Sequence, residues 1–262
     1  MIEITVYETA EITPTVRAQV HRLFDLTYDQ ADHEYLDKSL SVLRYIAFAT
    51  PAEYTQVEYI QAKYIPAKAT PAKADDGHQS TPVDDPRQDI CQSIGFAIGE
   101  TRRLDLPGIP GQQVGLAGLC CVDPRYRRRG IFQKLERSVI KEGMGELSNG
   151  RILAAGRMAH PASFRIMASN PTVVPRPNVI PTKFQQQVGQ IVAGSYKVSD
   201  FDPLTFVCKG NGHPIGCPRM TVEVESEEWD VFVSVDRANG DSLLALSWIP
   251  NAPRRWENEN PL

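Results

Sequence analysis

A strand, a basic turn and an amphipathic helix follow one another within residues 115–140, and this unit constrains the fold more than any other part of the chain. The first part, Gly115–Val122, is an apolar run of strand length. Asp123 and Pro124 close it, because proline disfavours the continuation of regular structure. Beyond the turn, apolar residues recur at helical spacing on one face: Ile131, Leu135, Val139 and Ile140. The pattern predicts a buried strand joined to a helix by a short turn.

The turn itself has the chemistry of an anion site. Three arginines and a glycine precede the helix, namely Arg127, Arg128, Arg129 and Gly130. The first amide groups of a helix have no partner within the helix, and the helix dipole favours a negative charge there. Glycine lets a phosphate group approach the backbone closely. The turn therefore predicts a pyrophosphate site, and a plain basic strand-to-helix turn is the alternative.

In this segment the chain resembles the GNAT (GCN5-related N-acetyltransferase) superfamily. The cofactor signature of that family is Arg/Gln-x-x-Gly-x-Gly/Ala after a strand that commonly ends in Val-x-Pro. The match here is VDPRYRRRGIF, residues 122–132, and it departs from the family at Phe132, where a glycine or alanine lies beside the pyrophosphate. The resemblance implies acetyl-CoA or another acyl-CoA as co-substrate. It implies binding by Cys121, Val122, Arg127, Arg128, Arg129, Gly130, Ile131 and Phe132, with the backbone near the first two polarising the thioester carbonyl.

The resemblance implies an α/β fold, a GNAT-like mixed twisted sheet with helices on both faces. It covers residues 1–170, and residues 171–262 are expected to form a C-terminal α+β extension that completes or covers the sheet. Residues 51–89 are rich in Pro, Ala, Lys and Asp. Because such a segment buries too little apolar surface to offset the entropy of ordering, it is expected to be a mobile insertion.

Periodicity and capping residues predict the remaining elements. Strands are expected at 1–7, 45–48, 93–99 and 151–155, and helices from Pro14 and at 33–43. The resemblance implies a further helix at 160–167. The strand at 93–99 should form an antiparallel hairpin with Gly115–Val122. The strand at 151–155 should lie parallel to Gly115–Val122 after a helical crossover. Towards the C-terminus, strands are predicted at 204–208, 221–224 and 243–249, with Trp229, Phe232 and Val235 at helical intervals.

Acyl transfer to an amine needs a base, and two residues are the candidates. Glu100 follows the strand at 93–99, and His160 starts the predicted helix at 160–167. Asp123 is a weaker candidate, since an aspartate before proline is usually a turn residue. The family commonly places a tyrosine that protonates the departing thiolate in the same helix. Here Met167 takes that position and cannot donate a proton.

The acceptor side of the site is predicted between the first two helices. An acidic group lies there, consisting of Asp29, Asp32, His33 and Glu34. The family usually builds acceptor specificity in this region, and the negative charge would suit a cationic acceptor. A solvated loop is the alternative interpretation of the same residues.

Composition excludes several classes of function. A net charge of −4 over 262 residues argues against a general nucleic-acid or membrane-surface binder, which usually relies on a broad positive field. The chain has neither a long apolar stretch nor the start of a signal peptide, so a cytoplasmic location is expected. Cys208, His213 and Cys217 cluster near a glycine-rich turn but lack the paired spacing of a zinc site, so no metal is predicted.

Two functions therefore follow from the sequence. The first is an acyl-CoA-dependent acyltransferase that moves an acyl group to a small-molecule amine. The second is a GNAT-like fold used for non-acylating biosynthetic chemistry, or for ligand binding without acyl-CoA turnover, since a fold does not fix a function. The C-terminal extension leaves a homodimer open as an expectation.

Overall fold

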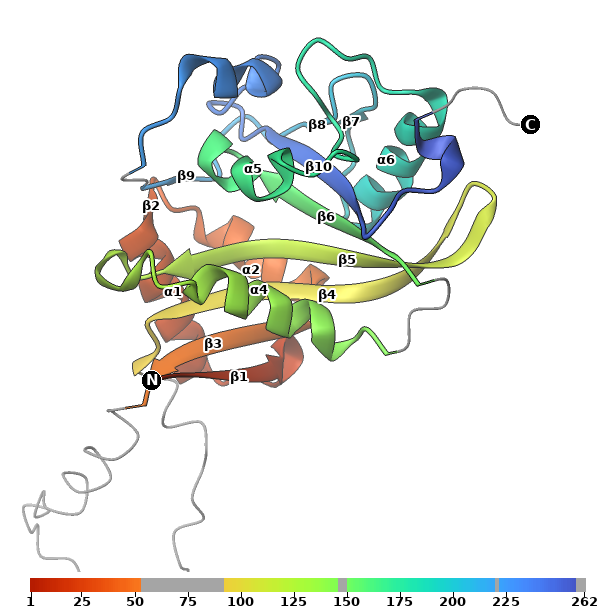
Figure 1. The fold of residues 1–262 in the computed structure, drawn as a ribbon. Helices are drawn as coiled ribbons and strands as arrows, with labels where there is room; N and C mark the ends of the chain where they lie inside the picture. The colour runs from red at the N-terminus through yellow and green to blue at the C-terminus, as the bar shows by residue number, and fades with distance from the viewer. Residues whose placement is uncertain (53–91, 146–149, 220–221, 258–262) are drawn as a thin grey trace, which may run out of the picture.

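The computed structural model describes residues 1–52, 92–145, 150–219 and 222–257 (Figure 1). The insertion predicted at 51–89 falls almost wholly outside these residues, and so does Cys91. Among the residues that the structure describes, no helix is long and apolar enough to cross a membrane.

One sheet runs through the molecule and carries the mixed strand directions that the sequence predicts. Its order is β1 (Ile2–Glu8), β3 (Tyr45–Pro51), β4 (Gly95–Leu106), β5 (Ile109–Val122), β6 (Ile152–Met158), β10 (Ser242–Ile249), β8 (Val207–Cys208) and β7 (Phe201–Asp202). Within this order, β5 and β6 are parallel, and the other neighbours pair antiparallel. A small second sheet joins β2 (Tyr28–Asp29) to β9 (Cys217–Pro218).

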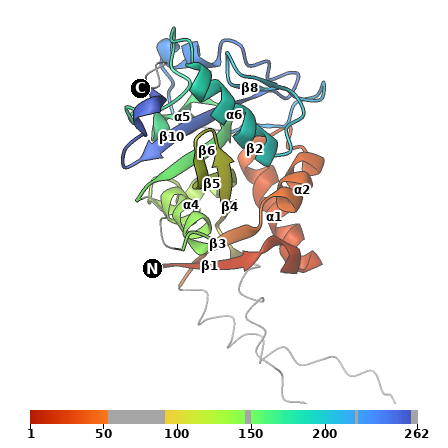
Figure 2. The same ribbon diagram turned by 90° about the vertical axis from the view of Figure 1, so that its right-hand side faces the viewer.

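Helices cover both faces of the large sheet, as Figure 2 shows. One face carries α1 (Pro14–Thr27), α2 (His33–Val42) and α6 (Lys183–Ser195), whose buried side chains share one core cluster. The other face carries α4 (Ile131–Glu142) and α5 (Pro161–Ala168). Short 3-10 helices lie at 9–11, 124–126, 226–232 and 254–256. The predicted fold class, a mixed twisted sheet with helices on both faces, is confirmed.

Local sequence signals explain where the helices begin. The hydroxyl of Thr13 accepts a hydrogen bond from the amide of Val16, and Pro14 occupies the first helical position of α1. The carboxylate of Asp32 accepts from the amides of Glu34 and Tyr35 at the start of α2. In the predicted apolar stripe of α4, Ile131, Leu135 and Val139 are buried, and Ile140 is partly buried.

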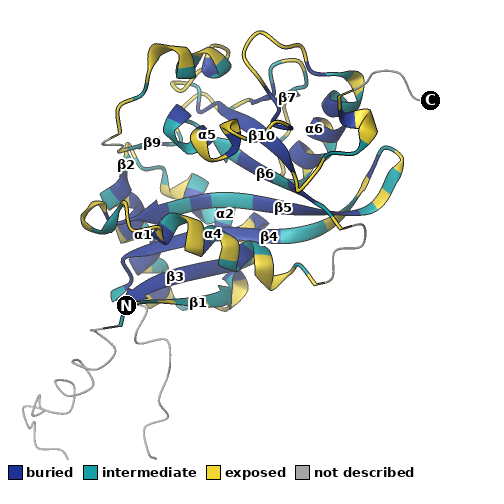
Figure 3. Cartoon of the chain, in the orientation of Figure 1, coloured by how far each residue is buried: buried dark blue, intermediate teal, exposed yellow. Residues whose placement is uncertain are grey.

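The C-terminal residues pack into the same core as the rest of the chain (Figure 3). Strand β10 pairs with β6 over its length and is buried except at Ile249. Trp248 of β10 packs edge-to-face on Trp256, with ring centroids 5.8 Å apart. The side chain of Gln185 in α6 donates to the carbonyl of Trp256 and ties this helix to the end of the described chain.

The structure of the C-terminal region differs from the sequence predictions in three places. Helix α6 was not predicted, although Thr182 and Gln185 form a capping box. The strand predicted at 204–208 is confined to Val207–Cys208, because the carboxylate of Asp202 accepts hydrogen bonds from the amide of Leu204 and the hydroxyl of Thr205 and folds the segment into a turn. Residues 222–224 are not a strand; the carbonyl of Glu223 accepts from Arg165 instead.

Candidate active site

The central feature of the site is the point where two parallel strands separate. Pairing between β5 and β6 runs from Val114 opposite Leu153 to Ala117 opposite Gly156 and then stops. Both strands continue beyond it, to Val122 and Met158. The last part of β5 is therefore paired with β4 on one edge and separated from β6 on the other.

A β-bulge explains why β5 turns away. Between two pairs, β4 advances from Ala97 to Gly99 while β5 retreats from Cys120 to Ala117, so β5 holds one extra residue. Such an insertion bends a strand and increases its twist. Gly118 lies in the bulge, where a Cβ atom would come within 2.5 Å of the Leu43 side chain and 2.9 Å of the Ile98 carbonyl oxygen. Only glycine fits there without a shift of its neighbours.

Tyr196, at the end of α6, bridges the two strands where they part. Its hydroxyl oxygen lies 2.8 Å from the carbonyl oxygen of Ala117 on β5 and 3.0 Å from that of Ala155 on β6. The hydroxyl has one proton and donates it to one carbonyl at a time. Burial raises the pKa of Tyr196 well above its usual value, so the proton is retained at neutral pH.

A cavity of about 790 Å³ opens at the separation of β5 and β6. It reaches through to both faces of the sheet. Its walls on the α4 and α5 side include Phe132, Glu136, Ile140, Ser163 and Met167. Its walls on the α2 and C-terminal side include Asp32, Glu34, Tyr35, Arg157, Tyr196 and His213. The volume is in the range of small-molecule sites, and the wall mixes apolar and charged groups in the manner of such sites.

The basic turn forms the start of α4, as predicted. Gly130 is the N-cap in a left-handed conformation with φ +70°, and nothing lies within 4 Å of the position of a Cβ atom there. No side chain caps the helix. The first amides of α4 are therefore available to a ligand, at the positive end of the helix dipole.

The predicted cofactor residues have different surroundings. Arg128 and Arg129 are exposed, and Arg129 lies over the Tyr126 ring. Arg127 donates to the carbonyl oxygens of Val122 and Arg219 and so holds the turn in place. Ile131 and Cys121 are buried in the core, and Phe132 lines the cavity. On β5, the described cavity wall includes Gly115, Ala117, Gly118, Leu119 and Cys120, and it does not include Cys121 or Val122.

Glu136 is one of the site residues that sequence reasoning missed. It lies outside the apolar stripe of α4, a position typical of a solvent-facing residue, yet it lines the cavity one turn after Phe132 and one turn before Ile140. Burial raises the pKa of its carboxyl to about 7. The signal in the sequence is the spacing of these three residues, which forms a second stripe beside the buried one.

Cys120 lines the same cavity as this carboxyl. Burial first, and the Glu136 charge second, raise the pKa of the Cys120 thiol well above its usual value. The thiolate is the nucleophilic form of cysteine. Cys120 is therefore neutral at physiological pH and is a poor candidate for a covalent acyl intermediate.

The two bases predicted from the sequence lie outside the described cavity walls. Glu100 is 6% exposed and pairs with Arg102, whose guanidinium lies 2.5 Å away and donates to the carbonyls of Val42 and Ser195. His160 caps α5: its Nδ1 accepts from the amide of Ala162, so the proton of the neutral ring lies on Nε2. Burial, together with nearby arginines, lowers the pKa of His160.

Asp123 is a turn residue, and Met167 lies in the cavity wall. The carboxylate of Asp123 accepts from the amide of Arg125, and the Arg125 guanidinium holds the pKa of Asp123 below its usual value. Asp123 is thus the turn residue before Pro124. Met167 lines the cavity from α5 and supplies no proton.

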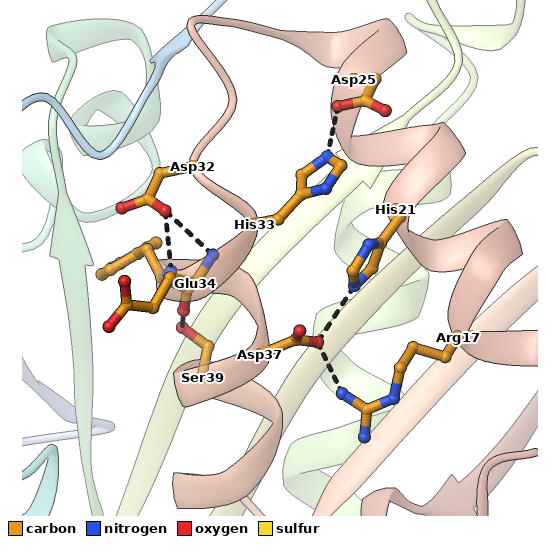
Figure 4. Close-up of polar contacts among 9 residues, drawn as sticks. Arg17, His21, Asp25, Asp32, His33, Glu34, Asp37 and Ser39 are labelled. Carbon is orange, nitrogen blue, oxygen red and sulfur yellow. Dashed lines mark hydrogen bonds and ion pairs between the residues drawn. The ribbon is translucent and has the colours of Figure 1, made fainter. Parts of the chain in front are cut away.

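The four residues of the predicted acidic group have different surroundings in the structure. Asp29 forms an ion pair with Arg219 at 2.6 Å. The imidazole of His33 points toward the carboxylate of Asp25, also at 2.6 Å (Figure 4), and His33 does not belong to the described cavity wall. Asp32 and Glu34 line the cavity. A carboxylate oxygen of Asp32 lies 3.6 Å from Nδ1 of His213, which lines the same part of the cavity wall. Only two of the four residues can therefore face an acceptor in the cavity.

The described residues hold no group of three His, Cys, Asp or Glu side chains placed to bind a metal ion. Cys208 is fully buried on β8, and burial raises the pKa of its thiol to about 11. His213 lies at the cavity wall, beside Asp32. Cys208 thus carries a buried neutral thiol and His213 a half-exposed imidazole, whereas the side chain of Cys217 lies outside the described part of the structure.

No protein-family model and no curated protein matches the sequence. Solved structures similar to this chain are acetyltransferases. The ribosomal-protein-S18-alanine N-acetyltransferase of Escherichia coli is 11% identical, with 96% of this chain and 97% of that chain covered, at a TM-score of 0.38. An aminoglycoside N-acetyltransferase in complex with CoA is 14% identical. The likeness covers 64% of this chain and 84% of that chain, at a TM-score of 0.35.

A GCN5-related glucosamine N-acetyltransferase region of a fungal multi-domain β-N-acetylglucosaminidase is also similar. It is 13% identical, and the likeness covers 77% of this chain and 17% of that chain, at a TM-score of 0.33. At TM-scores below 0.5, these likenesses give no information on the activity of this chain.

Proposed function

We propose that this chain is an acyl-CoA-dependent N-acyltransferase that transfers an acyl group to a small-molecule amine. The observation that carries this proposal is the separation of β5 from β6 over a cavity that begins beside the uncapped, basic N-terminus of α4. An acyl-CoA fits this combination, because its pyrophosphate suits the N-terminus of α4 and its thioester suits the separated strands. The resemblance in residues 122–132 supports the same substrate.

The turn would hold the pyrophosphate. The free amides of the first turn of α4 donate to phosphate oxygens, and Arg128 and Arg129 supply positive charge next to them. Gly130 permits a close approach, since no atom lies within 4 Å of its missing Cβ. The geometry of this turn is therefore compatible with a bound pyrophosphate group.

The separated strands would place the reacting carbonyl. Acyl-CoA supplies the activated thioester, and the backbone of β5 at Gly118, Leu119 and Cys120 borders the cavity without a strand partner on the β6 side. Backbone amides there can donate to the oxygen that gains negative charge in the transition state. The walls on both faces of the sheet bring the amine and the thioester together, which lowers the entropic part of the barrier.

Glu136 is the base that we propose. An ammonium acceptor must lose a proton before it attacks, and the Glu136 carboxyl lines the cavity with a pKa of about 7. Glu100 and His160 remain the bases predicted from the sequence. Because Cys120 is protonated, direct transfer to the amine is favoured over an acyl-cysteine intermediate.

A second function is favoured by two side chains in the cavity wall. Phe132 fills space where the family has glycine or alanine, and Met167 stands where the family commonly has a proton donor. Both changes suit a cavity that binds a different ligand, or that performs non-acylating chemistry. The acyl-CoA proposal and this alternative differ in whether free CoA is released.

Release of free thiol from acetyl-CoA, measured against a panel of small amines, tests the proposal. We expect thiol release that depends on the amine, and Glu136→Gln should lower it more than Glu100→Gln or His160→Ala. If Glu100→Gln or His160→Ala abolishes turnover with unchanged CoA affinity, that residue is the base instead. Binding of acetyl-CoA without thiol release from any amine would favour the second function.

A further inference from the structure

Arg157 lies at the point where β5 and β6 separate. It follows Gly156, the last residue of β6 that pairs with β5, and it pairs with Leu244 of β10 on the other edge. Side chains alternate along a strand. Arg157 therefore shares its face of the sheet with Leu153 and Ala155, which pack in the core cluster of α1, α2 and α6. This is the face opposite α4.

The contacts of Arg157 leave its charge without an anionic partner. Its Nε donates to the hydroxyl of Ser242 at 3.0 Å, and its guanidinium carbon lies 5.7 Å from the centre of the Tyr35 ring. Among the described residues, no carboxylate forms an ion pair with Arg157, whereas the half-buried Arg102 pairs with Glu100. Burial alone would lower the pKa of Arg157, but Tyr35, Cys208 and Tyr196 raise it overall. The side chain is a cation.

A buried cation without a counter-charge is costly, and buried charges in proteins are normally paired. Arg157 lines the cavity, so a ligand can supply the missing anion. The planar guanidinium matches a carboxylate through two parallel hydrogen bonds, and the stacked Tyr35 ring restricts its orientation. A carboxylate is the group that this environment fits best.

We propose that Arg157 binds a carboxylate of the acyl acceptor, so that the acceptor is an amine of the amino-acid type. This inference rests on the proposed acyl transfer. Arg157 is one residue from the end of the β5–β6 pairing, and a strand rises by about 3.4 Å per residue. A carboxylate held there lies only a few bonds from the place where the amine reacts. Asp32 and Glu34, on the same cavity, are available to a cationic group farther along the acceptor.

The face of the sheet assigns the carboxylate to the acceptor rather than to the acyl group. The basic turn and Glu136 belong to α4, on the opposite face from Arg157. An acyl-CoA that enters along α4 brings its thioester to the separation from one side. The acceptor then approaches from the side that Arg157, Tyr35 and Asp32 line.

The test compares amino acids with their carboxamides as acceptors of acetyl-CoA, with thiol release as the readout. We expect the wild type to prefer each reactive acid over its amide in kcat/KM by at least about tenfold. Arg157→Met should lower the acid rate and leave the amide rate nearly unchanged, so that the preference falls to about one. Arg157→Lys should keep part of the preference, because lysine keeps the positive charge but cannot donate the two parallel hydrogen bonds of a guanidinium. Arg103→Met, which removes an exposed arginine of β4, is the control.

The ratio of the two acceptors separates recognition from stability, since a loss of folded protein lowers both rates equally. Equal use of acids and amides by the wild type would overturn the inference, and so would an unchanged ratio in Arg157→Met. Succinyl-CoA against acetyl-CoA is the second arm. If Arg157→Met changes only the preference between these two esters, the carboxylate belongs to the acyl group and the acceptor assignment is wrong.

A third measurement keeps the two proposals distinguishable. If no amine releases thiol, the proposed acyl transfer has failed, and calorimetric titration with the same amino acids and amides tests the carboxylate site alone. Binding of acids but not amides, lost in Arg157→Met and retained in Arg103→Met, would support the site. The absence of binding by every acid would overturn it.

Discussion

The two edges of β5 differ, and the difference locates the function. On one edge β5 pairs with β4 from Gly95 opposite Val122 to Leu106 opposite Ile109, interrupted by bulges. On the other edge it pairs with β6 only from Val114 to Ala117. The first edge satisfies its backbone groups within the sheet and builds the core. The second leaves them beside a cavity, where a substrate can use them.

The largest expected effect concerns the carboxyl that faces the open edge. Replacing Glu136 by Gln keeps the shape of the side chain and removes the base, so we expect kcat for acyl transfer to fall by about 10²–10⁴-fold with little change in CoA affinity. The wild-type rate should rise with pH through about 7, as the carboxyl ionises. Glu142→Gln, at the exposed end of the same helix, is the matched control. A normal rate in Glu136→Gln would exclude this carboxyl as the base.

The same carboxyl links stability to pH. Its pKa is raised from 4.5 to about 7 in the folded chain, so its protonated form stabilises the fold fully below about pH 4.5 and this contribution is lost as the pH rises through 7. Glu136→Gln stays neutral and should gain stability over the wild type between pH 5 and 8, by at most about 3 kcal/mol. Urea unfolding of the two proteins at pH 5 and at pH 8 measures this gain in stability. A difference that does not depend on pH would contradict the burial of Glu136.

The bulge that opens β5 is expected to depend on Gly118. Gly118→Ala places a Cβ atom against Leu43 and the Ile98 carbonyl, and should destabilise the fold by about 1–3 kcal/mol. Gly194→Ala in α6 is the control, because nothing lies within 4 Å of its Cβ position and alanine favours a helix. Equal stability of the two variants in chemical denaturation would show that the bulge tolerates a side chain.

A smaller effect is expected at the bridge between the strands. Tyr196→Phe removes the hydroxyl that contacts Ala117 and Ala155 and should cost about 1 kcal/mol. Tyr126→Phe, at the basic turn, should change the free energy of unfolding by less than about 0.5 kcal/mol. Thermal denaturation of Tyr196→Phe, Tyr126→Phe and the wild type measures the two effects. If Tyr196→Phe is as stable as the wild type, the hydroxyl does not hold the two strands at their separation.

The paired edge of β5 was predictable from sequence, and much of the open edge was not. Alternation in β4 and β5 predicts the hairpin, and the helix between β5 and β6 predicts their parallel pairing. The basic turn was predictable because it is local. Glu136, Arg157 and Tyr196 were missed because they come from three separate elements and meet only after the sheet forms. Glu100, which follows a predicted strand like a site residue, faces Arg102 instead.

Calorimetric titration with acetyl-CoA tests the central claim most directly, in the wild type, Gly130→Leu and Gly150→Leu. Both glycines have φ near +70° with no atom within 4 Å of a Cβ position, so the two substitutions carry a similar backbone strain. Gly130 caps α4 at the basic turn, whereas Gly150 lies before β6. We expect one site in the wild type, binding weakened at least about tenfold in Gly130→Leu because the side chain blocks the phosphate, and wild-type binding in Gly150→Leu. No binding of acetyl-CoA to the wild type, or equal binding by all three proteins, would contradict an acyl-CoA site at this turn.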